Sequence, residues 1–405
     1  MENIDIKKLQ NNTNKMRIVN VAMVCKLMPY YRLGIFQKLT ALNGDIKFVF
    51  FGDTRQQGGI KQIPFSYANG VIGKKIRWVK TKNYFYKTER LLWQTGIIKE
   101  IFRKKYKVFV FEGAIAHFPI WLYALLCKLS NKKVLFWTHG NRGLDSGIKR
   151  VLRIILFKWL GDALLLYGNN QRLIMIKDGY NPKRLFVVYN SLQAEKQFKT
   201  LECLDLNKTQ KLKNKLFIFP NHFTMIFIGR LVKSKKVNDI LKVIQNLNFL
   251  NIRTNCIFIG DGPEKVSMLD NCNEYGIKEQ VHFAGPIYSE NQIAQYFAMS
   301  DIMISPGNVG LNCLHSMAYG VPVITHNELK FQNPEVEAIV KNCTGTFFEY
   351  YDLKSLTDSI INWIEKRPPK EQVIKNCQEM IKKTYSPENQ SMCIYNAINK
   401  VLKDV

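Results

Sequence analysis

Two cations in the second half of the chain have a spacing that suits a diphosphate. Arg230 and Lys235 lie five residues apart, directly after an apolar run that ends at Gly229. An arginine offers a planar fork to phosphate oxygens, and a lysine offers a compact point charge. If the apolar run is a strand, the pair lies at its carboxyl end and predicts an anion site. Solvated surface charge is the alternative, because further lysines flank the pair.

Glycines follow the next apolar run. In FIGDGPE (258–264) Gly260 ends the run, and the Asp-Gly-Pro that follows predicts a tight turn into a helix beginning near Glu264. Because they have no side chain, Gly260 and Gly262 would let a ligand approach the backbone closely. A simple turn explains this segment equally well.

A glycine-rich loop leads into a helix in SDIMISPGNVGLNCLHSMAYGVPVIT (300–325). We expect the amides of Gly310, Leu311 and Asn312 to face outward at the positive end of the helix dipole, where they would bind a phosphate. His315 lies one turn into the helix and could reach a ribose hydroxyl. A satisfied core histidine is the alternative for that residue.

The elements that must position these residues alternate along the whole chain. Short apolar runs alternate with helical patterns, first over residues 16–190 and again over 224–350. This order predicts an α/β fold with parallel sheets, built as two Rossmann-like doubly wound domains that face each other across a cleft. The expected parts are an N-terminal domain, a Lys-rich linker, a C-terminal domain and a helical tail, over residues 1–200, 201–221, 222–380 and 381–405.

The net charge and the cysteines limit the possible partners and the cellular compartment. The 405 residues include 59 Lys and Arg against 32 Asp and Glu, a net charge of +27. Such an excess indicates nucleic acid, an anionic membrane face, phosphorylated substrates or compositional drift. The nine cysteines show no CxxC spacing, so we expect free thiols in a reducing cytosol and no metal site. No segment has the composition of a signal peptide or a membrane span.

Four segments in register resemble a known family. GRLVKSK, IGDGPE, VHFAG and HSMAYGVPV stand in the order found in the nucleotide-sugar-binding domain of family-4 retaining glycosyltransferases of the GT-B fold. The resemblance covers residues 225–325. It implies a hexosyltransferase that takes a UDP- or GDP-linked sugar as substrate, with no cofactor and no metal. Arg230 and Lys235 would stabilise the leaving phosphate. The implied acceptor is a glycan or a lipid-linked oligosaccharide of surface polysaccharide biosynthesis.

The chain departs from this family at two positions. The family usually has two glutamates, separated by seven residues, around the glycine-rich loop, and Gly307 and His315 stand in their places here. We favour a subfamily that uses the loop backbone and the histidine instead. A different donor and an inactive relative are the alternatives.

The first half of the chain adds candidates for the sugar and the acceptor. His139, in WTHG, stands where the family places a histidine, and it would reach across the cleft to the donor sugar. Glu112 ends the apolar run VFVFE, and Tyr31 and Arg32 follow the first run; all three are candidates for the acceptor side. A histidine at a strand end and residues that merely cap a sheet are the structural alternatives.

Basic and aromatic residues are interleaved between 74 and 107, which suits the headgroup layer of an anionic membrane. We therefore expect a cytoplasmic protein that is peripheral at the inner face of the cell membrane. A solvated helix face is the alternative; nucleic acid is disfavoured because no binding motif accompanies the cluster. Two other functions stay open: epimerase-like nucleotide-sugar chemistry on a GT-B relative, and a non-catalytic basic protein that binds membrane or nucleic acid.

Overall fold

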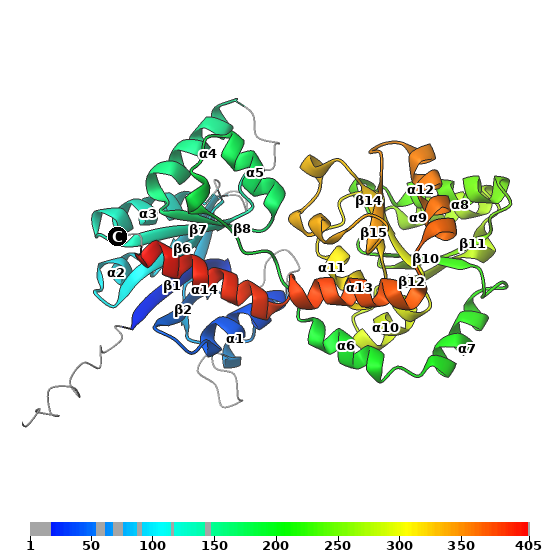
Figure 1. The fold of residues 1–405 in the computed structure, drawn as a ribbon, viewed down its shortest axis with the longest axis horizontal. Helices are drawn as coiled ribbons and strands as arrows, with labels where there is room; N and C mark the ends of the chain where they lie inside the picture. The colour runs from blue at the N-terminus through cyan, green and yellow to red at the C-terminus, as the bar shows by residue number, and fades with distance from the viewer. Residues whose placement is uncertain are drawn as a thin grey trace, which may run out of the picture. The chain divides into compact units, whose positions relative to one another are not determined.

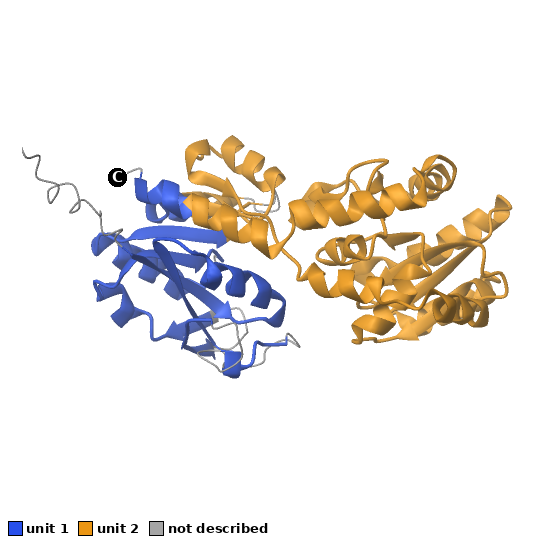
Figure 2. Ribbon diagram, turned by 60° about the horizontal axis from the view of Figure 1, so that its bottom comes forward, with its two compact units in different colours: residues 1–137, 156–163, 398–405 blue, residues 138–155, 164–397 orange. Residues whose placement is uncertain are grey.

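The computed structural model describes residues 18–53, 61–67, 76–86, 91–114, 117–141 and 147–403. The chain divides into two compact units (Figure 2): residues 1–137, 156–163 and 398–405 form one unit, and residues 138–155 and 164–397 form the other. Four residues of the expected basic cluster lie outside the described residues, namely Lys74, Lys75, Lys87 and Arg90.

The first sheet of the described chain has seven strands in the order β3-β2-β1-β6-β7-β8-β9 (Figure 1). The pairs β1–β2, β1–β6, β2–β3, β6–β7 and β8–β9 are parallel. The strands are β1 (Val19–Leu27), β2 (Ile46–Asp53), β3 (Trp78–Lys80), β6 (Tyr106–Glu112), β7 (Lys133–Thr138), β8 (Ala163–Leu166) and β9 (Leu185–Val187). The helices between them are α1 (Leu33–Ala41), α2 (Ile98–Phe102), α3 (Phe118–Leu129), α4 (Gly147–Leu160) and α5 (Asn169–Lys177).

The second sheet has six strands, all parallel, in the order β12-β11-β10-β13-β14-β15. The strands are β10 (Phe223–Ile228), β11 (Thr254–Ile259), β12 (Val281–Gly285), β13 (Ile302–Ser305), β14 (Val323–His326) and β15 (Gly345–Phe348). The helices are α6 (Ala194–Glu202), α7 (Leu206–Leu216), α8 (Val237–Phe249), α9 (Lys265–Glu274), α10 (Glu290–Ala298), α11 (Asn312–Ala318), α12 (Leu353–Lys366), α13 (Lys370–Lys383) and α14 (Pro387–Lys403). The prediction of an α/β fold with parallel sheets is therefore confirmed.

Burial explains why the strands were visible in the sequence. β11 and β13 are buried along their whole length, so each is mostly apolar and does not alternate between apolar and polar residues. A single hydrophobic core surrounds the second sheet and takes in α8, α11 and α13. The predicted helical tail is also present, and Pro387 opens α14.

The expected linker contains helices. α6 ends at Glu202, and α7 occupies most of 201–221 inside the second unit. The Asp205 side chain caps α7 by accepting a hydrogen bond from the backbone N–H of Lys208, 3.0 Å away. The sequence did not predict α7, because the segment is Lys-rich and the helix has one buried residue, Thr209.

The cysteines and the apolar character of the helices complete the description of the fold. All nine cysteines lie in the described ranges and are free thiols; six are buried, and Cys203 after α6 is exposed. In the described part of the chain, no helix combines the length and the apolar character needed to cross a bilayer.

Candidate functional site

The loops after β10 and β11 are pressed together at the carboxyl edge of the second sheet. A Cβ atom on Gly260 would lie 1.9 Å from the carbonyl oxygen of Gly229, and one on Gly262 would lie 2.3 Å from that of Leu231. The N–H groups of Gly229 and Leu231 donate to the carbonyls of Ile259 and Asp261, both at 2.9 Å. This packing alone requires glycine at 260 and 262. Contact of these glycines with a ligand stays a prediction.

The glycine-rich loop after β13 is fixed by side chains that the sequence analysis missed. Gln332 is fully buried; its Oε1 accepts from the N–H of Val309 at 3.0 Å, and its Nε2 donates to Thr325 Oγ1 at 2.8 Å. Thr325 Oγ1 donates in turn to the carbonyl of Ser305 at 2.7 Å. Asn308 Nδ2 donates to the carbonyl of Phe331 at 2.9 Å. Position 332 lies outside every motif, so only its buried amide identifies it.

Lys235 follows β10 and contacts the glycine-rich loop, and the expectation that it begins a helix is wrong. It closes the short 3₁₀ turn Lys233–Lys235, and α8 begins at Val237 after Lys236 adopts a left-handed backbone (φ 53°). The half-buried Lys235 ammonium donates to the carbonyl of Asn308. Burial lowers the pKa of Lys235, and the exposed Arg230 lowers it further. Two cations that repel each other in this way favour an anion between them.

The amides at the start of α11 lie beside this cation pair. Gly310 has a left-handed backbone (φ 56°), and α11 begins at Asn312, in whose first turn N–H groups lack helical partners. The Asn312 side chain donates to the carbonyl of Ile228, and a Cβ on Gly229 would lie 3.2 Å from the Asn312 amide nitrogen. Asn312 therefore joins the Gly229-Arg230 segment to the helix that follows the glycine-rich loop.

Gly307 has no room for any side chain. A Cβ atom there would lie 2.4 Å from the carbonyl oxygen of Ser234 and 2.8 Å from the Cα of Lys235. These are backbone atoms, which cannot rotate aside. The absence of the family's first glutamate therefore goes with a close approach between this loop and the segment that carries Lys235.

His315 has a carboxylate partner that the sequence did not reveal. Its Nε2 lies 3.6 Å from Glu290 Oε2, and its ring packs edge-on against Phe297 and Tyr319. The Tyr319 hydroxyl also donates to Glu290. The interaction with His315 is the main cause that lowers the pKa of Glu290, and the hydrogen bond from Tyr319 lowers it further. Glu290 lies 25 residues before His315, too far apart for spacing to indicate the pair.

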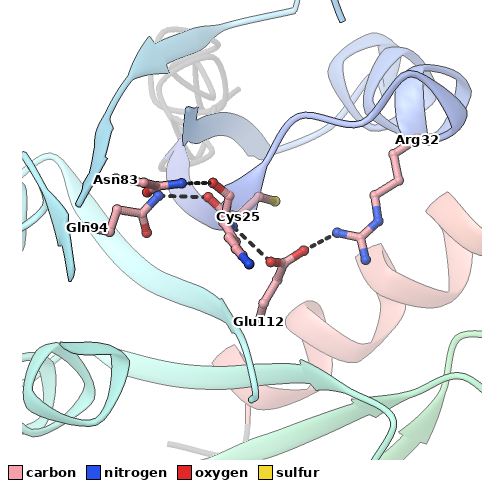
Figure 3. A network of polar contacts seen from close by, with 6 residues as sticks. Cys25, Arg32, Asn83, Gln94 and Glu112 are labelled. Atoms are coloured by element: carbon pink, nitrogen blue, oxygen red, sulfur yellow. Dashed lines mark hydrogen bonds and ion pairs between the residues drawn. The ribbon is translucent and has the colours of Figure 1, made fainter. Parts of the chain in front are cut away.

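In the first unit, two of the predicted acceptor-side residues meet. Arg32 forms an ion pair with Glu112 at the carboxyl edge of the first sheet, and Glu112 also accepts from the N–H of Lys26 at 2.8 Å (Figure 3). The Arg32 guanidinium lies over the rings of Trp137 and Tyr31, with centroids at 4.8 and 5.8 Å. Asn83 and Gln94 donate to the carbonyls at the end of β1, which fixes the strand under this pair.

His117 is a further candidate there that the sequence analysis missed. Burial lowers the pKa of His117, while the Glu112 carboxylate raises it. His139 lies just after β7, is exposed, and packs its ring on Tyr167 with 4.5 Å between centroids. The role of His139 toward the donor sugar stays a prediction.

The aromatics of the 74–107 segment divide between core and surface. Trp78 and Tyr106 are buried. Tyr84 and Trp93 face each other across the antiparallel hairpin of β4 (Lys82–Tyr86) and β5 (Leu91–Thr95), and both are about half exposed. Within the described ranges, no group of three or more His, Cys, Asp or Glu side chains is arranged to hold a metal ion.

Solved structures show the fold class of this arrangement. A lipopolysaccharide outer core galactosyltransferase, WaaB, in its apo form aligns with a TM-score of 0.67 at 13% identity, over 96% of this chain and 100% of that one. HepE of Anabaena in complex with UDP aligns with a TM-score of 0.67 at 13% identity, over 94% and 99%. The chain has the GT-B fold of glycosyltransferases.

The sequence comparisons point to one family within this fold. Residues 208–380 match the family model "Glycosyl transferases group 1". The N-acetyl-alpha-D-glucosaminyl L-malate synthase of Bacillus anthracis is 26% identical over 226 residues, which are 55% of this chain and 54% of that protein. The chain thus spans about half the length of this relative. The second half of the chain, over residues 208–380, is thus similar to group 1 glycosyltransferases.

Proposed function

We propose that this chain is a retaining hexosyltransferase that moves a sugar from a UDP- or GDP-linked donor to a glycan or lipid-linked oligosaccharide in surface polysaccharide biosynthesis. The observation that carries the proposal is the Lys235 ammonium, held in the glycine-rich loop by the Asn308 carbonyl beside Arg230. These cations would stabilise the diphosphate as it leaves, because they are already oriented before charge develops. The relatives support the donor class, since HepE is described in complex with UDP.

The remaining predicted residues would divide between nucleotide, sugar and acceptor. The amides of Gly310, Leu311 and Asn312 would bind the diphosphate, and His315, oriented by Glu290, would bind a ribose hydroxyl. His139 would contact the donor sugar. Tyr31, Arg32 and Glu112 would bind acceptor hydroxyls, with the ion pair fixing both charged groups.

Nucleotide binding tests the donor site. The thermal midpoint of the full chain is measured with UDP and with GDP, for the wild type, Lys235→Gln and the control Lys233→Gln, whose lysine is exposed on the same turn. We expect one diphosphate to raise the midpoint and Lys235→Gln to weaken binding roughly 10- to 100-fold, as for a lost charged hydrogen bond. No shift with either nucleotide, or equal behaviour of the two variants, would contradict the proposal.

Turnover tests the reaction class. UDP or GDP release is followed with candidate sugar donors and a lipid-linked acceptor, and the product anomer is read by NMR. A product of the same anomeric configuration as the donor supports retention. Donor consumption that needs no acceptor would favour epimerase-like chemistry instead.

We also propose that the protein works at an anionic membrane surface, through α4 rather than the 74–107 segment alone. Five apolar side chains of α4 are exposed, by 43% at Leu152 up to 86% at Ile148, while Phe157 is its one buried residue. Their spacing of three or four residues places Ile148, Val151, Leu152, Ile155 and Trp159 on one face. The helix also carries four cations and no acid, the composition of an interfacial helix.

Vesicle flotation tests the membrane proposal. The full chain is mixed with phosphatidylglycerol vesicles and with phosphatidylcholine vesicles, and the variant Ile155→Ser/Trp159→Ser is compared with Val266→Ser, an equally exposed apolar position on α9. We expect flotation with the anionic vesicles and its loss only in the α4 variant. Equal flotation with both lipids, or no effect of the α4 change, would refute a role for this helix.

A further inference from the structure

A cavity of about 450 Å³ lies in the second unit, away from the candidate donor site. Asp301, just before β13, and Pro322, just before β14, both line it, so it lies at the amino edge of the sheet. The glycine-rich loop follows β13 at the opposite, carboxyl edge. Helices α6, α7, α10, α11, α12 and α13 or the residues next to them contribute the rest of the wall.

The wall is mostly apolar. The volume of the cavity falls within the range of about 300–1,000 Å³ that is usual for small-molecule sites. The apolar side chains are Leu201, Leu204, Leu206, Phe297, Ala298, Val321, Pro322, Trp363, Val373 and Ile374. Such a wall suits a hydrocarbon chain or a ring system.

One wall residue has an unused hydrogen-bond donor. Trp363 is 3% exposed, and its indole N–H is buried without a partner in the described part of the chain. Buried donors are nearly always paired, because an unpaired one loses its hydration without compensation. Trp363 lines the cavity, so an acceptor bound there would satisfy this donor.

The mouth of the cavity carries charged side chains of both signs. Asp301 accepts a hydrogen bond from the N–H of Thr224 at 2.9 Å, and its other oxygen lies 3.8 Å from Arg367 and 3.6 Å from Lys370. Burial lowers the pKa of Lys213, which interacts with both Asp301 and Lys370. Among the lining residues, Arg367 and Lys370 balance Asp301 and the exposed Glu202, and Lys213 adds a third cation next to this group.

Trp363 lies in the last turn of α12, and Arg367 caps that helix, donating its backbone N–H to the Trp363 carbonyl at 3.0 Å; both residues line the cavity. We propose that this cavity binds a small amphipathic anion, an apolar chain or ring that ends in a carboxylate or a phosphate. The apolar part fills the space between the helices. The anionic group accepts from the Trp363 indole and meets Arg367 and Lys370 at the mouth.

Direct titration tests the site on the full chain. Laurate and dodecyl phosphate are titrated by calorimetry, with the variants Trp363→Phe and Lys370→Gln and the control Lys366→Gln, an exposed lysine outside the cavity. We expect saturable binding at one site. Trp363→Phe and Lys370→Gln should each weaken it about threefold or more, as for a lost hydrogen bond or ion pair, and Lys366→Gln should leave it unchanged. Whichever probe binds tighter identifies the head group.

Three results would overturn the proposal: no saturation with either probe, wild-type affinity in both cavity variants, or displacement of the probe by UDP, which would place it at the donor site. Lys370 is largely exposed, so its variant stays informative even if Trp363→Phe loosens the core. Failure of the nucleotide test at Lys235 would leave this inference untouched.

Discussion

Replacing Gly307 by alanine tests the close packing of the glycine-rich loop. The new Cβ would lie 2.4 Å from the Ser234 carbonyl oxygen, 1.0 Å short of the 3.4 Å at which ordinary contacts begin. Because the obstructing atoms are backbone, the Ser234–Lys235 turn must move. Overpacking of this kind costs about 1–3 kcal/mol. The displaced Lys235 would also lose its hydrogen bond to Asn308, so nucleotide affinity should fall together with stability.

Urea unfolding and UDP or GDP titration measure both effects. Gly276→Ala is the matched control, because a Cβ there meets nothing within 4 Å and only its positive φ of 63° is unfavourable, by about 1–2 kcal/mol. We expect the control to bind nucleotide normally and the Gly307 variant to bind weakly. A Gly307→Ala protein with wild-type midpoint and affinity would refute the packing argument. So would Gly307→Glu, the family's residue, if it proved fully stable.

Three further outcomes follow from the structure. Glu290→Gln should destabilise the protein by less than about 1 kcal/mol at neutral pH, as for a partly exposed pair. His315 lowers the pKa of Glu290, so the urea midpoint of the variant should lie below that of the wild type above pH 4.5. The two midpoints should converge on further acidification. Burial lowers the pKa of His326 to about 4, so wild-type stability should fall between pH 6.5 and 4, and His326→Phe should flatten that profile. Gly260→Ala should prevent stable folding of the second unit, measured by proteolysis, because the Gly229 carbonyl lies 1.9 Å from the new atom; a protease-resistant variant would contradict this.

The sequence predicts the strands well because their burial is two-sided. β11 and β13 are buried at every residue and mostly apolar, and the glycines that follow β10 and β11 mark their carboxyl ends. The helices of 201–221 were missed because α7 buries a single residue and its surface composition looks like a linker. The hydrophobic pattern of a segment therefore indicates how much of a helix or strand is buried, and it indicates less well whether that helix or strand forms.

The candidate site divides in the same way. Arg230, Lys235 and the loop are local signals, and the structure brings Lys235 to the loop. Gln332, Glu290 and His117 act across the fold, through a buried amide, a carboxylate on another helix and a neighbouring strand end. No spacing rule connects such residues, because their partners are set by tertiary packing. At Gly307 the sequence showed the departure from the family. It did not show the cause, which is the close approach of the Ser234–Lys235 backbone.

The distribution of thiols makes the native chain easy to label at one place. Burial raises the pKa of most of the cysteines, to about 11 for Cys272 and about 12 for Cys127, which keeps them protonated and unreactive. Cys203 is the exposed thiol, and its neighbours Glu202 and Leu204 both line the amino-edge cavity. A maleimide fluorophore should therefore attach first at Cys203. Without any engineered cysteine, it would report occupancy of the cavity as a change in emission.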